Sequence, residues 1–141
     1  MTREENFAAI FAAHRGREGA LLPILHEVQH VFGCVDAEAE RGIAHELNLS
    51  RAEVHGVVSF YHDFASVPDP RPCVELCRAE ACQARGVEAL VAAAEEAAGT
   101  RVRLKTVYCL GLCSVGPAAR VGESLFARLD EAALVSLVRC A

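Results

Sequence analysis

The first half of the chain places its hydrophobic residues at the spacing of amphipathic helices. The clearest pattern follows positions i, i+3, i+4 and i+7 and predicts a helix over about residues 21–32. Its apolar stripe consists of Leu21, Ile24, Leu25, Val28, Val31 and Phe32. Weaker patterns predict further helices over about residues 4–14 and 37–47, and a fourth that starts near residue 51. The first half therefore reads as a small helical bundle.

Residues that start and stop helices agree with these boundaries. Pro23 lies in the first turn of the second predicted helix, where proline is tolerated, and Gly33 follows the last apolar residue of that helix. Asp36 is placed to cap the third helix, and Ser50-Arg51-Ala52-Glu53 has the form of a capping box for the fourth. The apolar face predicted for the fourth helix comprises Val54, Val57, Val58, Tyr61 and Phe64.

A proline-rich segment separates this bundle from a second pattern. Three prolines between residues 68 and 72 forbid a helix and predict a boundary between a helical docking region, residues 1–67, and a second domain, residues 68–141. The elements predicted beyond it are a strand at 73–77, a helix at 81–98, a strand at 102–108, a hairpin that turns at Gly122-Glu123, and a final helix capped by Asp130. This order is that of a thioredoxin-like sheet with helices packed on it, so the predicted fold class is α+β.

Composition and charge restrict the classes of function. The apolar fraction of 52% and the charged fraction of 23% fit a folded, soluble protein, and the net charge of -5 argues against a nucleic-acid protein. The scattered Lys and Arg residues argue against nucleic-acid binding, which needs a clustered basic surface. We find no apolar run of membrane-spanning length and no signal peptide, so we expect a cytoplasmic location. That compartment keeps thiols reduced, and the seven cysteines are an odd number, so metal or redox chemistry is favoured over a disulfide framework.

Four of the cysteines occur in two local pairs. Cys77 and Cys82 are separated by four residues, and Cys109 and Cys113 by three. We interpret these four residues, called the four paired thiols below, as the ligands of one [2Fe-2S] cluster, because such clusters are held by four cysteine thiolates.

The surroundings of the pairs favour the same interpretation. Gly111 and Gly116 allow the backbone to approach inorganic sulfide closely. Cys82 falls near the start of a predicted helix, where N–H groups favour the negative charge of the cluster. Arg78 and Arg85 could add positive charge, although solvated arginines are the commoner explanation for both.

The same cysteines have other possible uses. A structural zinc site also uses four cysteines but usually pairs them at a tighter spacing, and a zinc-stabilised interaction domain is kept as an alternative. A thioredoxin-type dithiol needs Cys-x-x-Cys, which the chain lacks. For Cys34, Cys73 and Cys140 we expect packing roles, because each is isolated beside an apolar segment. Cys73 is the least settled of the three, since it shares a strand face with Cys77.

A literal H-E-x-x-H, the zinc-peptidase signature, occurs at residues 26–30. On a helical wheel, however, His26 and His30 lie opposite the apolar stripe of their helix. We therefore expect an exposed or subunit-facing surface and no peptidase site.

Together these motifs resemble a known family. Two segments precede the four paired thiols: Leu22-Pro23-Ile24-Leu25-His26-Glu27-Val28-Gln29 and Val57-Val58-Ser59-Phe60-Tyr61. This combination resembles the 24 kDa-type subunits of respiratory complex I and the small subunits of NAD-linked hydrogenases and formate dehydrogenases. The resemblance covers about residues 5–139. Phe60-Tyr61-His62-Asp63-Phe64 and Cys77-Arg78-Ala79-Glu80-Ala81-Cys82-Gln83 look most like the gamma subunit of cytoplasmic NAD-dependent, molybdenum-containing formate dehydrogenase. Complex I members more often have Gly-Thr where this chain has Ala79-Glu80, which favours the formate dehydrogenase branch.

The resemblance implies a helical amino-terminal region, a thioredoxin-like [2Fe-2S] domain, and a partner subunit that binds FMN and NADH. The cluster would exchange single electrons with the flavin, and this chain would have no catalytic residue of its own. An equivalent subunit of complex I or of an NAD-linked hydrogenase is the alternative. The chain also lacks a glycine-rich phosphate loop after its first strand, so no nucleotide site is predicted on it.

Overall fold

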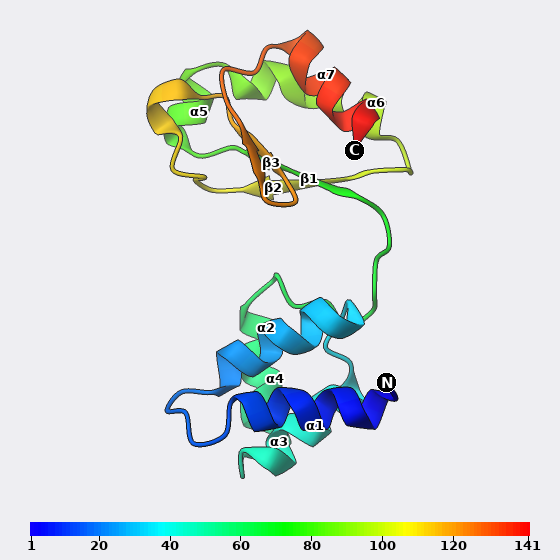
Figure 1. The fold of residues 1–141 in the computed structure, drawn as a ribbon. Coiled ribbons are helices and arrows are strands. Elements are labelled where there is room, and N and C mark those ends of the chain that lie inside the picture. Colours follow the sequence, from blue (N-terminus) through cyan, green and yellow to red (C-terminus); the bar gives the residue numbers. More distant parts are fainter. The chain divides into compact units, whose positions relative to one another are not determined.

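The computed structural model describes residues 1–141, which form two compact units, Met1–Pro70 and Arg71–Ala141 (Figure 1). The division falls within the proline-rich segment. Each unit has a hydrophobic core of its own. The helices and strands of the two units confirm the predicted α+β class.

The first unit contains four helices. Their bounds are α1 Arg3–Ala13, α2 Leu21–Phe32, α3 Ala37–Glu46 and α4 Arg51–Phe60. The predicted caps are confirmed: Gly33 ends α2 with φ 76°, the Asp36 side chain accepts from Ala39 N–H at the start of α3, and Ser50 and Glu53 form a capping box. Local capping chemistry therefore determines where these helices begin and end.

The core of the first unit comes mainly from the predicted apolar stripes. Ile24, Leu25 and Val28 of α2 pack with Ile43 of α3 and Val54 of α4, and all five are fully buried or nearly so.

Three predicted core residues are placed differently. Val31 is 44% exposed, so the stripe of α2 is narrower than predicted. Helix α4 ends at Phe60, so Tyr61 is its cap and Phe64 joins the core from the following loop. The helical spacing of apolar residues continues past Phe60, so the sequence pattern predicted a longer helix than the structure has.

The second unit is a mixed four-stranded sheet with helices. Its strands, in the order β2-β1-β3-β4, are β1 Cys73–Cys77, β2 Arg103–Val107, β3 Ala119–Val121 and β4 Ser124–Phe126. Its helical elements are α5 Glu80–Ala84, the short 3-10 helices η1 Val87–Leu90 and η2 Cys113–Val115, α6 Val91–Ala98 and α7 Glu131–Cys140. Strands β1 and β2 are parallel, and the other pairs are antiparallel.

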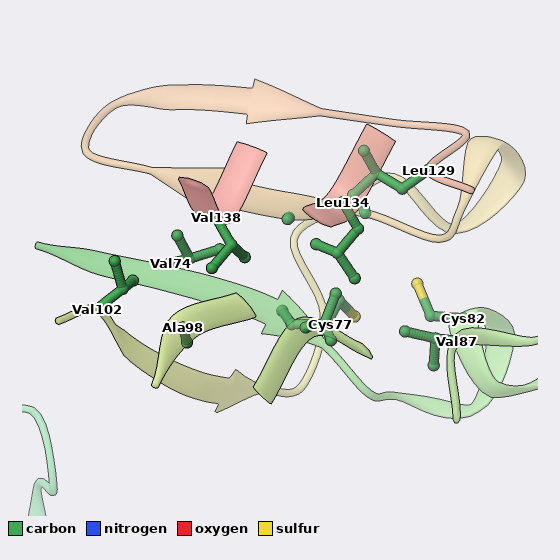
Figure 2. Close-up of a cluster of buried hydrophobic side chains, with 13 residues drawn as sticks. Val74, Cys77, Cys82, Val87, Ala98, Val102, Leu129, Leu134 and Val138 are labelled. Atoms are coloured by element: carbon green, nitrogen blue, oxygen red, sulfur yellow. The ribbon is translucent and has the colours of Figure 1, made fainter. Parts of the chain in front are cut away.

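Alternation along β1 separates the two faces of the sheet. Val74 and Leu76 point into a core shared with Ala98 of α6 and with Leu134 and Val138 of α7, part of which Figure 2 shows. In Figure 1, α6 and α7 lie on the same side of this sheet, in agreement with that core. The sheet is therefore anchored by one layer of helices on one face.

The predicted single helix over residues 81–98 is wrong. Gly86 adopts φ 91°, in the left-handed region, and divides the segment into α5, η1 and α6. Glycine reaches this conformation without the steric cost that other residues have, so the chain turns here. No helix of the protein combines the length and the apolarity that a membrane span requires.

Candidate metal centre

The parallel pairing of β1 and β2 brings the two cysteine pairs to the same edge of the sheet. Cys77 is the last residue of β1 and is opposite Val107, the last residue of β2. Because parallel strands run in the same direction, the loops that follow them leave from one edge. The first loop leads to Cys82 and the second carries Cys109 and Cys113, so pairs far apart in the sequence become neighbours in space.

The thiols interact within each pair and between the pairs. The sulfurs of Cys109 and Cys113 lie 3.6 Å apart, and the thiols of Cys77 and Cys82 form a hydrogen bond. Cys113 also interacts electrostatically with Cys77 and Cys82, across the two loops. No three His, Cys, Asp or Glu side chains in the protein surround one ion-sized position. Two adjacent pairs of thiols suit two metal atoms, each with two protein ligands.

Backbone N–H groups converge on the sulfur of Cys77. Burial alone would raise the pKa of this thiol, but hydrogen bonds from the N–H groups of Ala79, Cys109 and Leu110, together with the Cys82 thiol, outweigh burial and lower the pKa. The residue that turns the second loop, Cys109, has φ 96°, an uncommon conformation for a residue with a side chain. The second loop thus carries the thiols of Cys109 and Cys113, and two of its N–H groups donate to the sulfur of Cys77.

The pKa is raised for two other thiols of the site, Cys82 and Cys113. Burial, followed by the hydrogen bond with Cys77, raises the pKa of Cys82. The hydrogen bond with Cys109, followed by the charge of that thiol, raises the pKa of Cys113. Gly111 N–H donates to the sulfur of Cys109 at 3.3 Å, which adds a donor on the exposed side. The polar groups around the thiols therefore favour negative sulfur at Cys77 and also contact Cys109.

Gly116 makes room for the sulfur of Cys82. A Cβ atom built on Gly116 would lie 2.9 Å from Cys82 Sγ and 3.4 Å from Arg85 Cδ. Gly116 has φ -65°, so its backbone conformation is open to any residue. Space beside the sulfur of Cys82 is therefore the reason for glycine here, and the predicted approach of the backbone to inorganic sulfide stays a prediction.

The two pairs differ sharply in exposure. Cys77 and Cys82 are each 2% exposed and belong to the core of the second unit, where Figure 2 shows both side chains. Cys109 and Cys113 are exposed. The site is thus enclosed on one side and open on the other.

The charged residues near the site are arranged differently from the expectation. Arg78, considered as a solvated arginine, forms a bidentate ion pair with Glu88 at 2.8 and 2.6 Å. Cys82 is in the first turn of a helix as expected, but α5 has only five residues, so its contribution from peptide dipoles is small. Sequence periodicity gave no signal for the Arg78–Glu88 pair, because it crosses the break at Gly86.

The three remaining cysteines lie in different surroundings, and only Cys73 shares an element with one of the four paired thiols, since β1 runs from Cys73 to Cys77. Cys34 is buried, in agreement with a packing role, and Cys73 is partly buried at the start of β1. Cys140 is exposed at the end of α7, so the predicted packing role is wrong for this residue. The last turn of a terminal helix has one side without a neighbour, and Cys140 lies on it.

The H-E-x-x-H segment has other contacts. His26 and His30 are exposed, as predicted. The carboxylate of Glu27 lies 2.7 Å from Nε2 of His14, and the ring of His26 packs on Phe64 with centroids 5.0 Å apart. The His14–Glu27 pair was not found from the sequence, because His14 caps the end of α1 and Glu27 lies within α2.

The donors of the site fit a [2Fe-2S] cluster. Four cysteine sulfurs are in two pairs, N–H groups are directed at the sulfurs of Cys77, Cys82 and Cys109, and Gly116 leaves space beside that of Cys82. These are the features by which proteins hold such clusters and adjust their potentials.

Comparison with known proteins gives consistent results. A model of the family described as thioredoxin-like [2Fe-2S] ferredoxin matches residues 7–141. The HndA subunit of the NADP-reducing hydrogenase of Solidesulfovibrio fructosivorans is 32% identical over 119 residues, which cover 78% of this chain and 70% of the relative. A subunit of the NADH-quinone oxidoreductase of Rhizobium meliloti is 31% identical, with 98% of this chain and 88% of the relative covered.

A solved structure gives the same fold. The crystal structure of an NAD+-reducing [NiFe]-hydrogenase in the air-oxidized state matches 84% of this chain with a TM-score of 0.69 and 26% identity. The match spans only 22% of that hydrogenase chain. The thioredoxin-like domain predicted from the sequence is thereby confirmed.

Proposed function

Because the chain belongs to the thioredoxin-like [2Fe-2S] ferredoxin family, whose members carry one [2Fe-2S] cluster, we propose that the four paired thiols bind that cluster. The observation that carries this proposal is the convergence of the two pairs at one edge of the sheet, beyond the ends of β1 and β2. The bound cluster supplies one-electron redox chemistry.

The residues of this chain would adjust that chemistry. A cluster with four thiolate ligands becomes more negative when it accepts an electron. N–H groups that donate to Cys77 and Cys109 stabilise negative sulfur and so favour the reduced form. The buried thiols would exclude water from one side of the cluster, while the exposed thiols would leave the other side open to a redox partner.

We further propose that the protein is an electron-transfer subunit of an NAD-linked oxidoreductase and works beside a subunit that binds FMN and NADH. The names of the relatives support this role, since they are subunits of an NADP-reducing hydrogenase and of an NADH-quinone oxidoreductase. Residues 1–67 would form the docking region. Substrate chemistry would take place on other chains, in a cytoplasmic complex.

Among such complexes we propose an NAD-dependent formate dehydrogenase. The support is the resemblance of Phe60-Tyr61-His62-Asp63-Phe64 and of the first cysteine loop, Cys77–Cys82, to the gamma subunits of those enzymes. A complex I or hydrogenase assembly is the second candidate, and the relatives named above favour it. Purification of the complex from its native cells distinguishes them: formate should reduce NAD, whereas hydrogen should not reduce NAD and NADH should not reduce a quinone.

The cluster itself can be tested on the chain alone. Protein purified without oxygen should be brown, contain iron and acid-labile sulfide in equal amounts, and give an electron-spin signal on reduction. Serine at any of the four paired thiols should disturb that signal. Cys140→Ser is the matched control, because this cysteine is exposed and distant in sequence, and it should leave the spectrum unchanged. Colourless protein with one zinc and no iron would instead favour a zinc-stabilised domain.

A further inference from the structure

Arg78, the residue after Cys77, connects three parts of the site. Its N–H donates to the carbonyl of Val107 at 2.9 Å, and its own carbonyl accepts from Gln83 Nε2 at 2.7 Å. Its guanidinium holds the carboxylate of Glu88 through Nε at 2.8 Å and through a terminal nitrogen at 2.6 Å. Backbone and side chain of one residue are therefore fixed at the same time.

These contacts close the loop between Cys77 and Cys82 and join it to the second loop. Val107 ends β2 and is two residues before Cys109. Gln83 directly follows Cys82, and Glu88 lies in η1, beyond the turn at Gly86. A shift of Arg78 would consequently move Cys77 relative to the thiols of Cys82 and Cys109.

The ion pair is half-exposed, with side-chain exposures of 33% for Arg78 and 47% for Glu88. Ion pairs this exposed contribute little to stability, but two parallel hydrogen bonds fix the orientation of both partners. The pair also has no net charge, so the positive charge next to Cys77 is compensated by Glu88. Geometry and local charge are the two quantities that this pair can control.

We propose that Arg78 and Glu88 are positioning residues that hold the Cys77–Cys82 loop around the cluster and set the charge beside it. This inference rests on the proposed ligand set. Reduction adds one electron, supplied by dithionite, and thus one negative charge to the cluster. Removal of the Glu88 charge should therefore favour the reduced form and raise the reduction potential, whereas removal of the Arg78 charge should lower it.

The test uses the full chain with its cluster and four variants. Glu88→Gln should raise the midpoint potential and Arg78→Gln should lower it in a dithionite titration followed by the electron-spin signal. The double variant R78Q/E88Q restores the charge balance, and its potential should return toward that of the wild type. Arg78→Lys keeps the charge but loses the two-pronged contact, so its potential should stay near that of the wild type.

Loop geometry has a separate readout, the rate at which a chelator removes iron. All four variants lose the two-pronged contact, so each should release iron about tenfold faster, the lower end of the effect typical for residues that orient metal ligands. A variant that loses its iron during purification, with a circular dichroism spectrum like that of the wild type, supports the same conclusion.

Two matched controls change the same charges at the other end of the sheet. Arg101 precedes β2 and donates to the carbonyls of Val138 and Ala141, and Glu123 lies in the turn between β3 and β4. Arg101→Gln and Glu123→Gln should leave potential and iron release close to those of the wild type.

Three outcomes would overturn the inference: shifts of the same sign in Glu88→Gln and Arg78→Gln, shifts no larger than those of the controls, or unchanged iron release in Arg78→Lys. Absence of a [2Fe-2S] signal from the wild type would instead contradict the proposed function. The two failures are therefore distinguishable.

Discussion

Replacement of Gly116 by alanine tests the packing around the site directly. The added methyl carbon would lie 2.9 Å from Cys82 Sγ, whereas non-bonded carbon atoms prefer a separation of about 3.5–4.0 Å and sulfur is larger than carbon. Either the methyl group or the sulfur must therefore move by about 0.6 Å or more. Arg85 can swing away, but Cys82 is 2% exposed and has little room.

The expected costs follow from this crowding. Overpacking of this kind typically destabilises a protein by about 1–3 kcal/mol. A functional site also tolerates displacements of only about 0.5 Å, so the cluster should be affected as well. We expect Gly116→Ala to lower the denaturant midpoint of the second unit, to contain less iron per chain, and to show an altered electron-spin signal when reduced.

Gly56→Ala is the matched control. Gly56 lies within α4, and an added Cβ would meet nothing within 4 Å. Alanine there should stabilise the helix by about 0.5–1 kcal/mol and leave the cluster spectrum unchanged. If Gly116→Ala instead contained a full cluster with the wild-type signal and unfolded at the wild-type denaturant concentration, the close contact between Gly116 and Cys82 would have no functional meaning.

Two further predictions concern the scaffold. Leu134 is fully buried beneath the sheet, so Leu134→Ala should cost about 2–5 kcal/mol in urea unfolding of the second unit, and a cost below about 1 kcal/mol would contradict its place in the core. Asp36→Ala removes the cap of α3 and one of the two carboxylates paired with Arg3, and it should destabilise the first unit by about 1 kcal/mol with no change in the cluster signal. The hydrogen bond from Ala39 N–H, followed by the charge of Arg3, lowers the pKa of Asp36 below its ordinary value of 3.8, against the opposing effect of burial. The contribution of ionised Asp36 to the free energy of unfolding should therefore be complete above pH 3.8 and be lost as the pH falls through the lowered pKa. The thermal midpoints of Asp36→Ala and the wild type should accordingly converge in acid and stay apart at neutral pH.

Local chemistry made much of the fold predictable. The caps at Gly33, Asp36 and Ser50 involve residues close together in the sequence, and each forms as predicted. The break at Gly86 was missed because the apolar spacing continues through it, although glycine itself was the available signal. Tyr61 and Phe64 were misplaced for a related reason, since apolar periodicity does not show where a helix stops.

The site was less accessible from the sequence. Spacing identified the two cysteine pairs as candidates. The pairs come together only because Cys77 is paired with Val107 in parallel strands, and these two residues are 30 positions apart in the sequence. The ion pair of Arg78 with Glu88 and the space left by Gly116 arise from tertiary packing and have no periodic signature. The ligand set remains a prediction that the cysteine variants test.

The unequal exposure of the two cysteine pairs has a consequence for damage and repair. Oxidants and chelators reach the site from the side of Cys109 and Cys113, while Cys77 and Cys82 stay enclosed by the core. If the four paired thiols hold the proposed cluster, loss of iron should therefore begin at the exposed pair. A protein that delivers a new cluster would enter by the same side, so that replacement of the cofactor would not require the core of the second unit to unfold.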